Sequence, residues 1–161
     1  MTRQKLLLVM LILSSATAVS ARGTAARDSS VLVIDDIRFE AERFVVDSAT
    51  NVATVELSLV NLKKTPRELK VNVYGTQLVD DRRDAYYFST IGLGRVLMRF
   101  TDKQNYLHYL LQPDSPAKLV ITAEGISPGA AIQVVKIVFE DSAEEGRFLD
   151  AYLTEASGAA N

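Results

Sequence analysis

Polar and apolar residues alternate with a period of two along much of the chain. In residues 36–41, 53–59 and 69–74 every second side chain is apolar, and many of these are β-branched. Such alternation is typical of a strand with one face on a core and the other in water. No segment between Val31 and Glu140 sustains the 3.6-residue period of an amphipathic helix. The pattern therefore predicts strands throughout this part of the chain.

Residues that favour turns separate the apolar segments. Pro66 lacks the N–H that a strand ladder needs, and Gly75 marks a bulge or the end of a strand. Further turn-forming stretches lie at 47–51, 80–84, 92–94, 101–105, 113–116 and 124–129. The apolar segments between the later turns lie at 85–89, 95–100, 105–112, 117–124 and 131–140. Short strands at a spacing of roughly 8 to 12 residues are typical of a β-sandwich or a β-barrel.

Residues 141–153 allow two interpretations. A helix could begin at Ser142, with Glu145 completing a capping box. Alternatively, residues 141–146 form a loop, and residues 147–153 form a last strand that pairs with 131–140. Gly146 is poorly placed in such a helix, so the sequence favours the strand.

The first 21 residues have the pattern of a secretory signal peptide. Arg3 and Lys5 precede an apolar run at 6–13, and small and polar residues follow up to Ala21. Cleavage after Ala21 places small residues where signal peptidases require them, and Ala16 with Ala18 offers a second site. The alternative is a membrane anchor, but the apolar run is well below the roughly 20 residues that a spanning helix needs.

The pattern predicts an exported chain with one folded domain. We expect a signal peptide at 1–21, a flexible lead-in at 22–30, a β-sandwich domain at 31–153 and a disordered tail at 154–161. Periplasmic or secreted location follows, with no membrane anchor after cleavage.

The chain contains no cysteine, so neither lipidation at the cleavage site nor disulfides are available to it. The domain must therefore fold by burying apolar surface. Removing residues 1–21 takes away two basic residues and no acidic one, which moves the net charge from −2 to −4. That mild negative charge argues against nucleic acid as a partner.

Three acidic residues at 80–84 raise the possibility of a cation site. Asp80, Asp81 and Asp84 could offer carboxylate oxygens to a hard cation such as Ca²⁺. Arg82 and Arg83 lie between them and would compete for the same oxygens, and no glycine is placed to fold a ligand loop. The composition favours a charged hairpin turn.

His108 is the only histidine and therefore the first candidate for acid–base chemistry. It could pair with an aspartate from 80–84 in an envelope hydrolase. No nucleophile motif, metal-binding helix motif or cysteine accompanies it, so a histidine at the surface of a strand is the simpler interpretation. Gly92 and Gly94 do not form a phosphate-binding loop and favour a bend between strands.

Aromatic residues are dense between positions 86 and 109. On a sandwich surface they could seat a protein partner or stack on a sugar, although the chain has no tryptophan, the strongest sugar-stacking residue. The alternative is that half of them lie in the core and the rest are scattered. The candidate binding residues are Tyr86, Tyr87, Tyr106, His108 and Tyr109.

The order of segments between residues 55 and 139 carries a family resemblance. The stretches are VELSLVNLKKTPRELKVNVYG, DRRDAYYF at 81–88, LLQPDSPAKLVIT at 110–122, and IQVVKIVFE near the end. This arrangement resembles small exported bacterial domains with an immunoglobulin-like β-sandwich and unknown function. The resemblance implies an immunoglobulin-like antiparallel β-sandwich and a role in interaction or as an accessory subunit. It implies no catalytic residues.

Together these observations predict an exported, non-catalytic β-sandwich that binds another envelope or extracellular protein. The prediction includes no cofactor, no metal and no nucleic acid. Two alternatives stay open: an envelope hydrolase that uses His108 with an aspartate from 80–84, and a module that binds a cation or a sugar.

Overall fold

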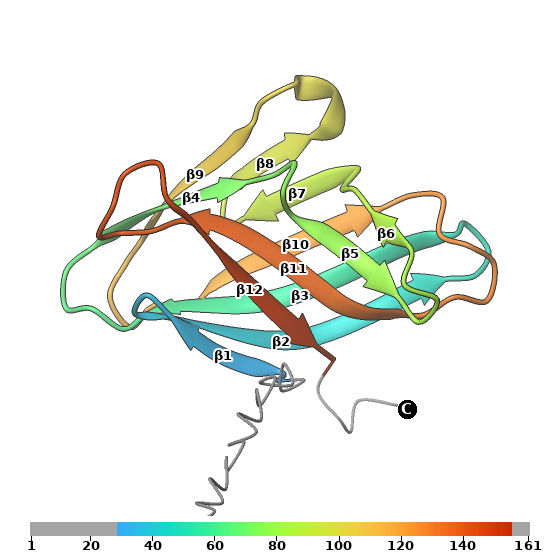
Figure 1. Cartoon of the computed structure of the whole chain (residues 1–161), viewed down its shortest axis with the longest axis horizontal. Helices are drawn as coiled ribbons and strands as arrows, with labels where there is room; N and C mark the ends of the chain where they lie inside the picture. The colour runs from blue at the N-terminus through green and yellow to red at the C-terminus, as the bar shows by residue number, and fades with distance from the viewer. Residues whose placement is uncertain (1–28, 156–161) are drawn as a thin grey trace, which may run out of the picture.

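A computed structural model describes residues 29–155, and these residues are folded into twelve strands and one short 3-10 helix (Figure 1). All strand pairs within the two sheets are antiparallel. The predicted all-β class is confirmed. The signal peptide, residues 22–28 of the lead-in and residues 156–161 of the tail lie outside the described residues. Within residues 29–155, no helix has the length and apolar character needed to cross a membrane.

The first sheet contains six strands. Their order across the sheet is β1 (Val31–Ile34), β2 (Ile37–Asp47), β3 (Val52–Asn61), β10 (Ala117–Ala123), β7 (Thr90–Leu93) and β8 (Val96–Arg99). The strands β1 and β8 are therefore its edges.

The second sheet runs in the order β6 (Ala85–Tyr86), β5 (Gln77–Asp80), β11 (Ile132–Glu140), β4 (Arg67–Asn72) and β9 (Tyr106–Leu111). The last strand, β12 (Phe148–Thr154), also pairs with β11, from Val134 opposite Thr154 to Glu140 opposite Phe148.

This pairing confirms the strand interpretation of residues 147–153 and shows that the helix interpretation is wrong. Residues 141–147 form the connecting loop, and Gly146 has a φ of +80°, which a right-handed helix cannot contain.

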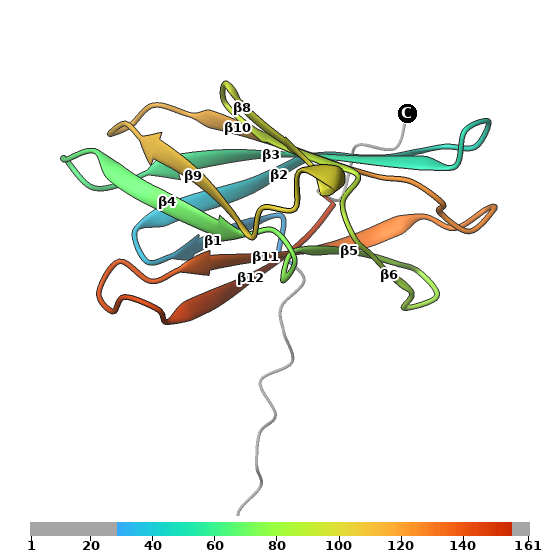
Figure 2. The ribbon, with the colours of Figure 1, turned by 90° about the horizontal axis from the view of Figure 1, so that it is seen from above.

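The two sheets form two layers around one apolar core (Figure 2). Alternation along β3 places Ala53, Val55, Leu57 and Leu59 in that core with no exposed surface. Phe39 from the first sheet and Phe139 from the second meet there with their ring centroids 5.2 Å apart. The period-two pattern of the sequence is thus the pattern of inward-facing side chains.

The two glycines at 92 and 94 do not form the one bend between strands that the sequence predicted. Gly92 lies inside β7, paired with Val120 on one side and Leu97 on the other. Gly94 alone makes the turn into β8, with a φ of +57°. The sequence could not separate their roles, because β7 has only four residues, one of them glycine, and so short a strand shows almost no alternation of polar and apolar residues.

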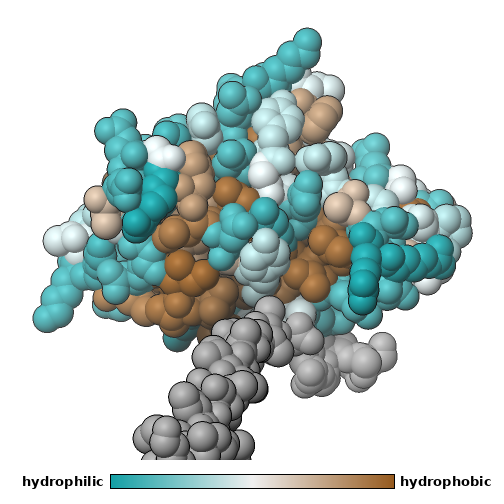
Figure 3. Space-filling model, in the orientation of Figure 1, coloured by the Kyte–Doolittle hydropathy of each residue, from teal (hydrophilic) through white to brown (hydrophobic). Residues whose placement is uncertain are grey.

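The beginning of β1 and the end of β12 lie side by side. The backbone N–H of Thr154 donates a hydrogen bond to the carbonyl of Ser29 (3.3 Å). Apolar side chains gather over this seam, where Val31 and Val33 are exposed (Figure 3). The hairpin of β7 and β8 and the strand β9 lie on the opposite side of the molecule (Figure 1).

Candidate functional site

The turn at 80–84 is organised around the buried carboxylate of Asp80, which is only 2% exposed. This carboxylate accepts hydrogen bonds from the backbone N–H groups of Arg82 (2.9 Å) and Asp84 (2.8 Å) and from the hydroxyl of Tyr86 (2.9 Å). Because β5 and β6 pair across the turn, the predicted charged hairpin is confirmed. The oxygens of Asp80 are occupied by protein donors.

The other two aspartates do not join Asp80 in a cluster of ligands. Asp81 accepts a hydrogen bond from the backbone N–H of Ala131 (3.2 Å). Across the part of the chain that the structure describes, no group of three or more His, Cys, Asp or Glu side chains is placed to hold a metal ion.

His108 lies on the outer face of β9, where its Nδ1 is 2.8 Å from Oε1 of Glu68 on β4. The three aspartates of 80–84 lie on and after β5, and β11 and β4 separate β5 from β9. The structure therefore does not bring together the predicted acid–base pair. Glu68 was not singled out in the sequence, because it lies 40 positions from His108 and in a different strand.

His108 borders a shallow charged groove of about 490 Å³. The lining residues are Arg67, Glu68, Lys70, His108, Glu140, Asp141, Ser142 and Glu145. Lys70 pairs with Glu140 (3.0 Å), and this carboxylate raises the pKa of the Lys70 ammonium. The cations of this groove are thus neutralised by neighbouring carboxylates.

The tyrosines do not form one face, contrary to the simplest form of the sequence hypothesis. Tyr86 is half-buried in the turn, where it bonds to Asp80. Tyr106 stacks on Phe148 at 5.8 Å on the outer face of the second sheet. Tyr109 lies on the opposite face of β9 and packs against the core. Alternation along the strands separates these side chains, which sequence proximity had placed together.

Of the four candidate tyrosines, Tyr87 is the exposed one, at 54%, and it lines a second groove of about 580 Å³. We call this the aromatic groove. Its lining residues are Tyr87, Phe88, Ser89, Thr90, Arg99, Phe100, Thr101 and Glu124. It lies at the end of β8, where the chain enters the 3-10 helix η1 (Phe100–Asp102).

Phe100 lines the aromatic groove, and contacts with neighbouring residues hold its ring in place. It is 47% exposed, yet its ring meets those of Phe88 (5.7 Å between centroids) and Tyr74 (5.6 Å). Its backbone N–H donates to the carbonyl of Ser89 (3.0 Å). A half-exposed aromatic ring held in this way is prepared for contact, since little conformational entropy is lost when another surface covers it.

Exposed apolar side chains continue from the groove along β8. Leu97 is 61% exposed on the outer face of β8, and Val96 is exposed on the opposite face, because successive side chains of a strand alternate. Gly92 lies opposite Leu97 and has no side chain, so the surface beside Leu97 is recessed. We define the β8 edge surface as Tyr87, Val96, Leu97, Arg99 and Phe100. Only Tyr87 was identified from the sequence, because the position of a strand at a sheet edge is not a local property.

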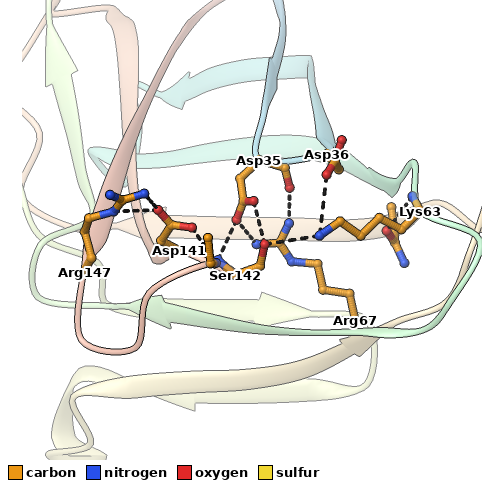
Figure 4. A network of polar contacts seen from close by, with 9 residues as sticks. Asp35, Asp36, Lys63, Arg67, Asp141, Ser142 and Arg147 are labelled. Carbon is orange, nitrogen blue, oxygen red and sulfur yellow. Dashed lines mark hydrogen bonds and ion pairs between the residues drawn. The ribbon is translucent and has the colours of Figure 1, made fainter.

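A network of polar contacts closes one end of the two sheets (Figure 4). The Arg67 guanidinium pairs with the carboxylate and the backbone carbonyl of Asp35. Asp35 also accepts hydrogen bonds from the backbone N–H (2.8 Å) and the hydroxyl (2.7 Å) of Ser142. Lys63 lies 3.5 Å from Asp36, and Arg147 pairs with Asp141. Apart from Nε of Arg67, these groups bond to one another, and they join three loops, so we assign them to stability.

Five carboxyl groups have a pKa below the ordinary value: Asp35, Asp47, Asp80, Glu140 and Asp141. For Asp47, Glu140 and Asp141 the largest cause is a hydrogen bond from a backbone N–H, which favours the charged form and lowers the pKa. For Asp35 and Asp80, burial alone raises the pKa, but hydrogen bonds to the carboxylate outweigh it.

We therefore expect the protein to lose stability in acid. A carboxyl group whose pKa is lower in the folded state adds stability above its ordinary pKa of about 4, and this stability is lost as the pH falls through the folded value. The urea midpoint of unfolding is expected to change little between pH 7 and pH 5 and to fall steeply below about pH 4. Asp80→Asn is expected to flatten this dependence, and equal midpoints at pH 6 and pH 3 would contradict the assignment.

The comparison with known proteins adds no assignment to this geometry. No protein-family model matches the chain, and no match is found among the curated proteins.

Proposed function

We propose that this chain is an exported, non-catalytic domain with an immunoglobulin-like β-sandwich, and that it binds another envelope protein through the β8 edge surface. The signal-peptide pattern of residues 1–21 supports export. Two antiparallel sheets around a common core, together with the resemblance between residues 55 and 139, support the immunoglobulin-like architecture.

One observation carries the binding function: exposed apolar side chains lie next to an open strand. Leu97 is 61% exposed and Phe100 is 47% exposed, and Phe100 lines a groove with aromatic walls. Aromatic residues beside a pocket are the usual anchors of protein interfaces. The charged groove at His108 offers no comparable apolar anchor.

A photo-crosslinking experiment tests this surface. We would place benzoylphenylalanine at position 97 or 100 of the tagged full chain and irradiate the native cells. Both positions are expected to give one adduct of the same mass with an envelope protein, and the mature chain is expected to begin at Arg22. Positions 62 and 152 are the matched controls, because Leu62 and Tyr152 are exposed apolar residues elsewhere.

The purified pair then gives a quantitative test. Leu97→Asp and Phe100→Ser are each expected to weaken binding about 30-fold, corresponding to about 2 kcal/mol for a central apolar anchor. Tyr152→Ser is expected to leave the affinity unchanged. Equal adducts at all four crosslinker positions, or none at 97 and 100, would remove the support for this surface.

A further inference from the structure

The backbone of β8 is open on one side. No strand pairs with β8 beyond β7 among the described residues. The Phe100 N–H bonds to Ser89 across the β7 pair, and hydrogen-bonded pairs alternate in an antiparallel ladder. The backbone N–H and C=O groups of Val96 and Met98 therefore form hydrogen bonds with β7, whereas those of Leu97 and Arg99 point to the open side.

A hydrogen bond at Arg99 agrees with this assignment. The Arg99 N–H donates to the carboxylate of Asp102 (2.7 Å), which lies outside the β7–β8 pair. The Asp102 carboxylate thus satisfies the N–H of Arg99, the last backbone donor on the open side of β8. The N–H and C=O of Leu97 and the C=O of Arg99 are left for a further strand.

The other edges of the two sheets are less suitable for an added strand. The edges β1 and β12 lie beside one another and share the hydrogen bond between Thr154 and Ser29. The edge β6 has only two residues. The edge β9 is open and carries the exposed Leu110, but its other outer side chains are engaged, with Tyr106 on Phe148 and His108 on Glu68, and the groove beside it is lined by charged and polar residues. Among the edges that the structure describes, β8 is the one that combines an open backbone and exposed apolar side chains with a groove lined by aromatic rings.

The charge around β8 indicates the chemistry of the occupant. Arg95 and Arg99 are exposed on either side of Leu97, and neither forms an ion pair with another described residue. The whole chain, by contrast, has a net negative charge. A basic edge on an acidic protein favours an acidic segment.

The same charges disfavour a second copy of this chain. Antiparallel pairing of two β8 edges about Leu97 would place Arg95 of one copy opposite Arg99 of the other. Like charges directly opposite one another across a ladder are destabilising. A partner of different sequence therefore fits better.

We propose that β8 takes up an extended, acidic segment of the partner protein by strand addition. The segment pairs with the backbone of Leu97 and Arg99, its acidic residues lie against Arg95 and Arg99, and one apolar side chain enters the aromatic groove. This inference rests on the proposed function, because it specifies how the partner is held at the β8 edge surface.

A selection from random dodecapeptides displayed on phage tests the proposal. The protein, purified after expression of the full chain, is expected to enrich sequences with acidic and β-branched residues. A synthetic peptide from this selection is expected to bind Arg95→Glu/Arg99→Glu at least about tenfold more weakly, since two favourable charge contacts become repulsive. Methylation of alternate amide nitrogens of the peptide is expected to abolish binding, and NMR is expected to show slower hydrogen exchange at the Leu97 amide.

Arg38→Glu/Arg43→Glu is the matched control, because it makes the same change in charge at exposed positions of β2. Equal loss in this control, protection at β9 instead of β8, or no enriched peptide would overturn strand addition. If the protein forms a dimer through β8 and a selected peptide dissociates it, the occupant of β8 is a second copy of this chain, and the proposal of a partner segment is also overturned. If crosslinks at 97 and 100 still form in these cases, the proposed function stands and only the strand-addition inference fails.

Discussion

Replacing Arg67 by methionine is expected to lower the free energy of unfolding by about 3 to 5 kcal/mol, the usual cost of removing one partner from a buried ion pair. Arg67 is 7% exposed, and its guanidinium holds the carboxylate and the carbonyl of Asp35. Through Asp35 it also joins β4 to the loop that carries Ser142. The variant leaves Asp35 charged, partly buried and without its cation. Urea unfolding followed by circular dichroism gives the value.

Lys63→Met is the control for this prediction. Its ion pair with Asp36 belongs to the same network but is largely exposed, so its loss is expected to cost less than about 1 kcal/mol. The double variant Asp35→Asn/Arg67→Met is expected to be more stable than Arg67→Met, because it removes the uncompensated charge. Nε of Arg67 is buried without a hydrogen-bond partner in the described structure, which is a cost that the double variant also removes. Equal stability of Arg67→Met and Lys63→Met would contradict a structural role for the buried pair.

Gly94→Ala is expected to lower the free energy of unfolding by about 3 kcal/mol, for two additive reasons. A left-handed φ costs an L-residue about 1 to 2 kcal/mol, and φ is +57° here. A Cβ at this position would also overlap the hydroxyl oxygen of Tyr109 and lie 2.6 Å from two of its ring carbons. The ring must move away from its packed position, at a cost typical of overpacking, about 1 to 3 kcal/mol.

Gly125→Ala separates the two causes. Gly125 has a φ of +74°, but nothing lies within 4 Å of the Cβ that alanine would add. This control is expected to show the backbone cost alone. Tyr109→Leu, which shortens the side chain, is expected to reduce the additional effect of Gly94→Ala. If both glycine variants lose the same stability, the contact between the hairpin turn and Tyr109 contributes nothing.

The sequence predicted those features that depend on neighbouring residues. Alternation identified β2, β3 and β4, the apolar segments between turns identified β10 and β11, and Gly146 correctly argued against a helix after residue 141. The turn at 80–84 followed from its composition, because Asp80 bonds to backbone groups only two and four positions ahead. Local patterns of this kind depend only on residues that are close together in the sequence.

Features that depend on strand order could not be predicted. His108 was a candidate base, but its partner Glu68 comes from β4, and this pairing follows from the order β4–β9 alone. Arg67 was not singled out in the sequence, because its buried ion pair is with a residue 32 positions earlier. Leu97 became a candidate only when β8 proved to be an edge. Each of these properties requires knowledge of which segments meet in space.

The hydrogen bond between Thr154 and Ser29 has a mechanical consequence for the folded domain. The chain enters the folded part and leaves it at one point, so a pull on either end acts at the same place. That place lies across the molecule from the β7–β8 hairpin (Figure 1). A support attached through either end would therefore lie across the molecule from β8 and leave that edge accessible.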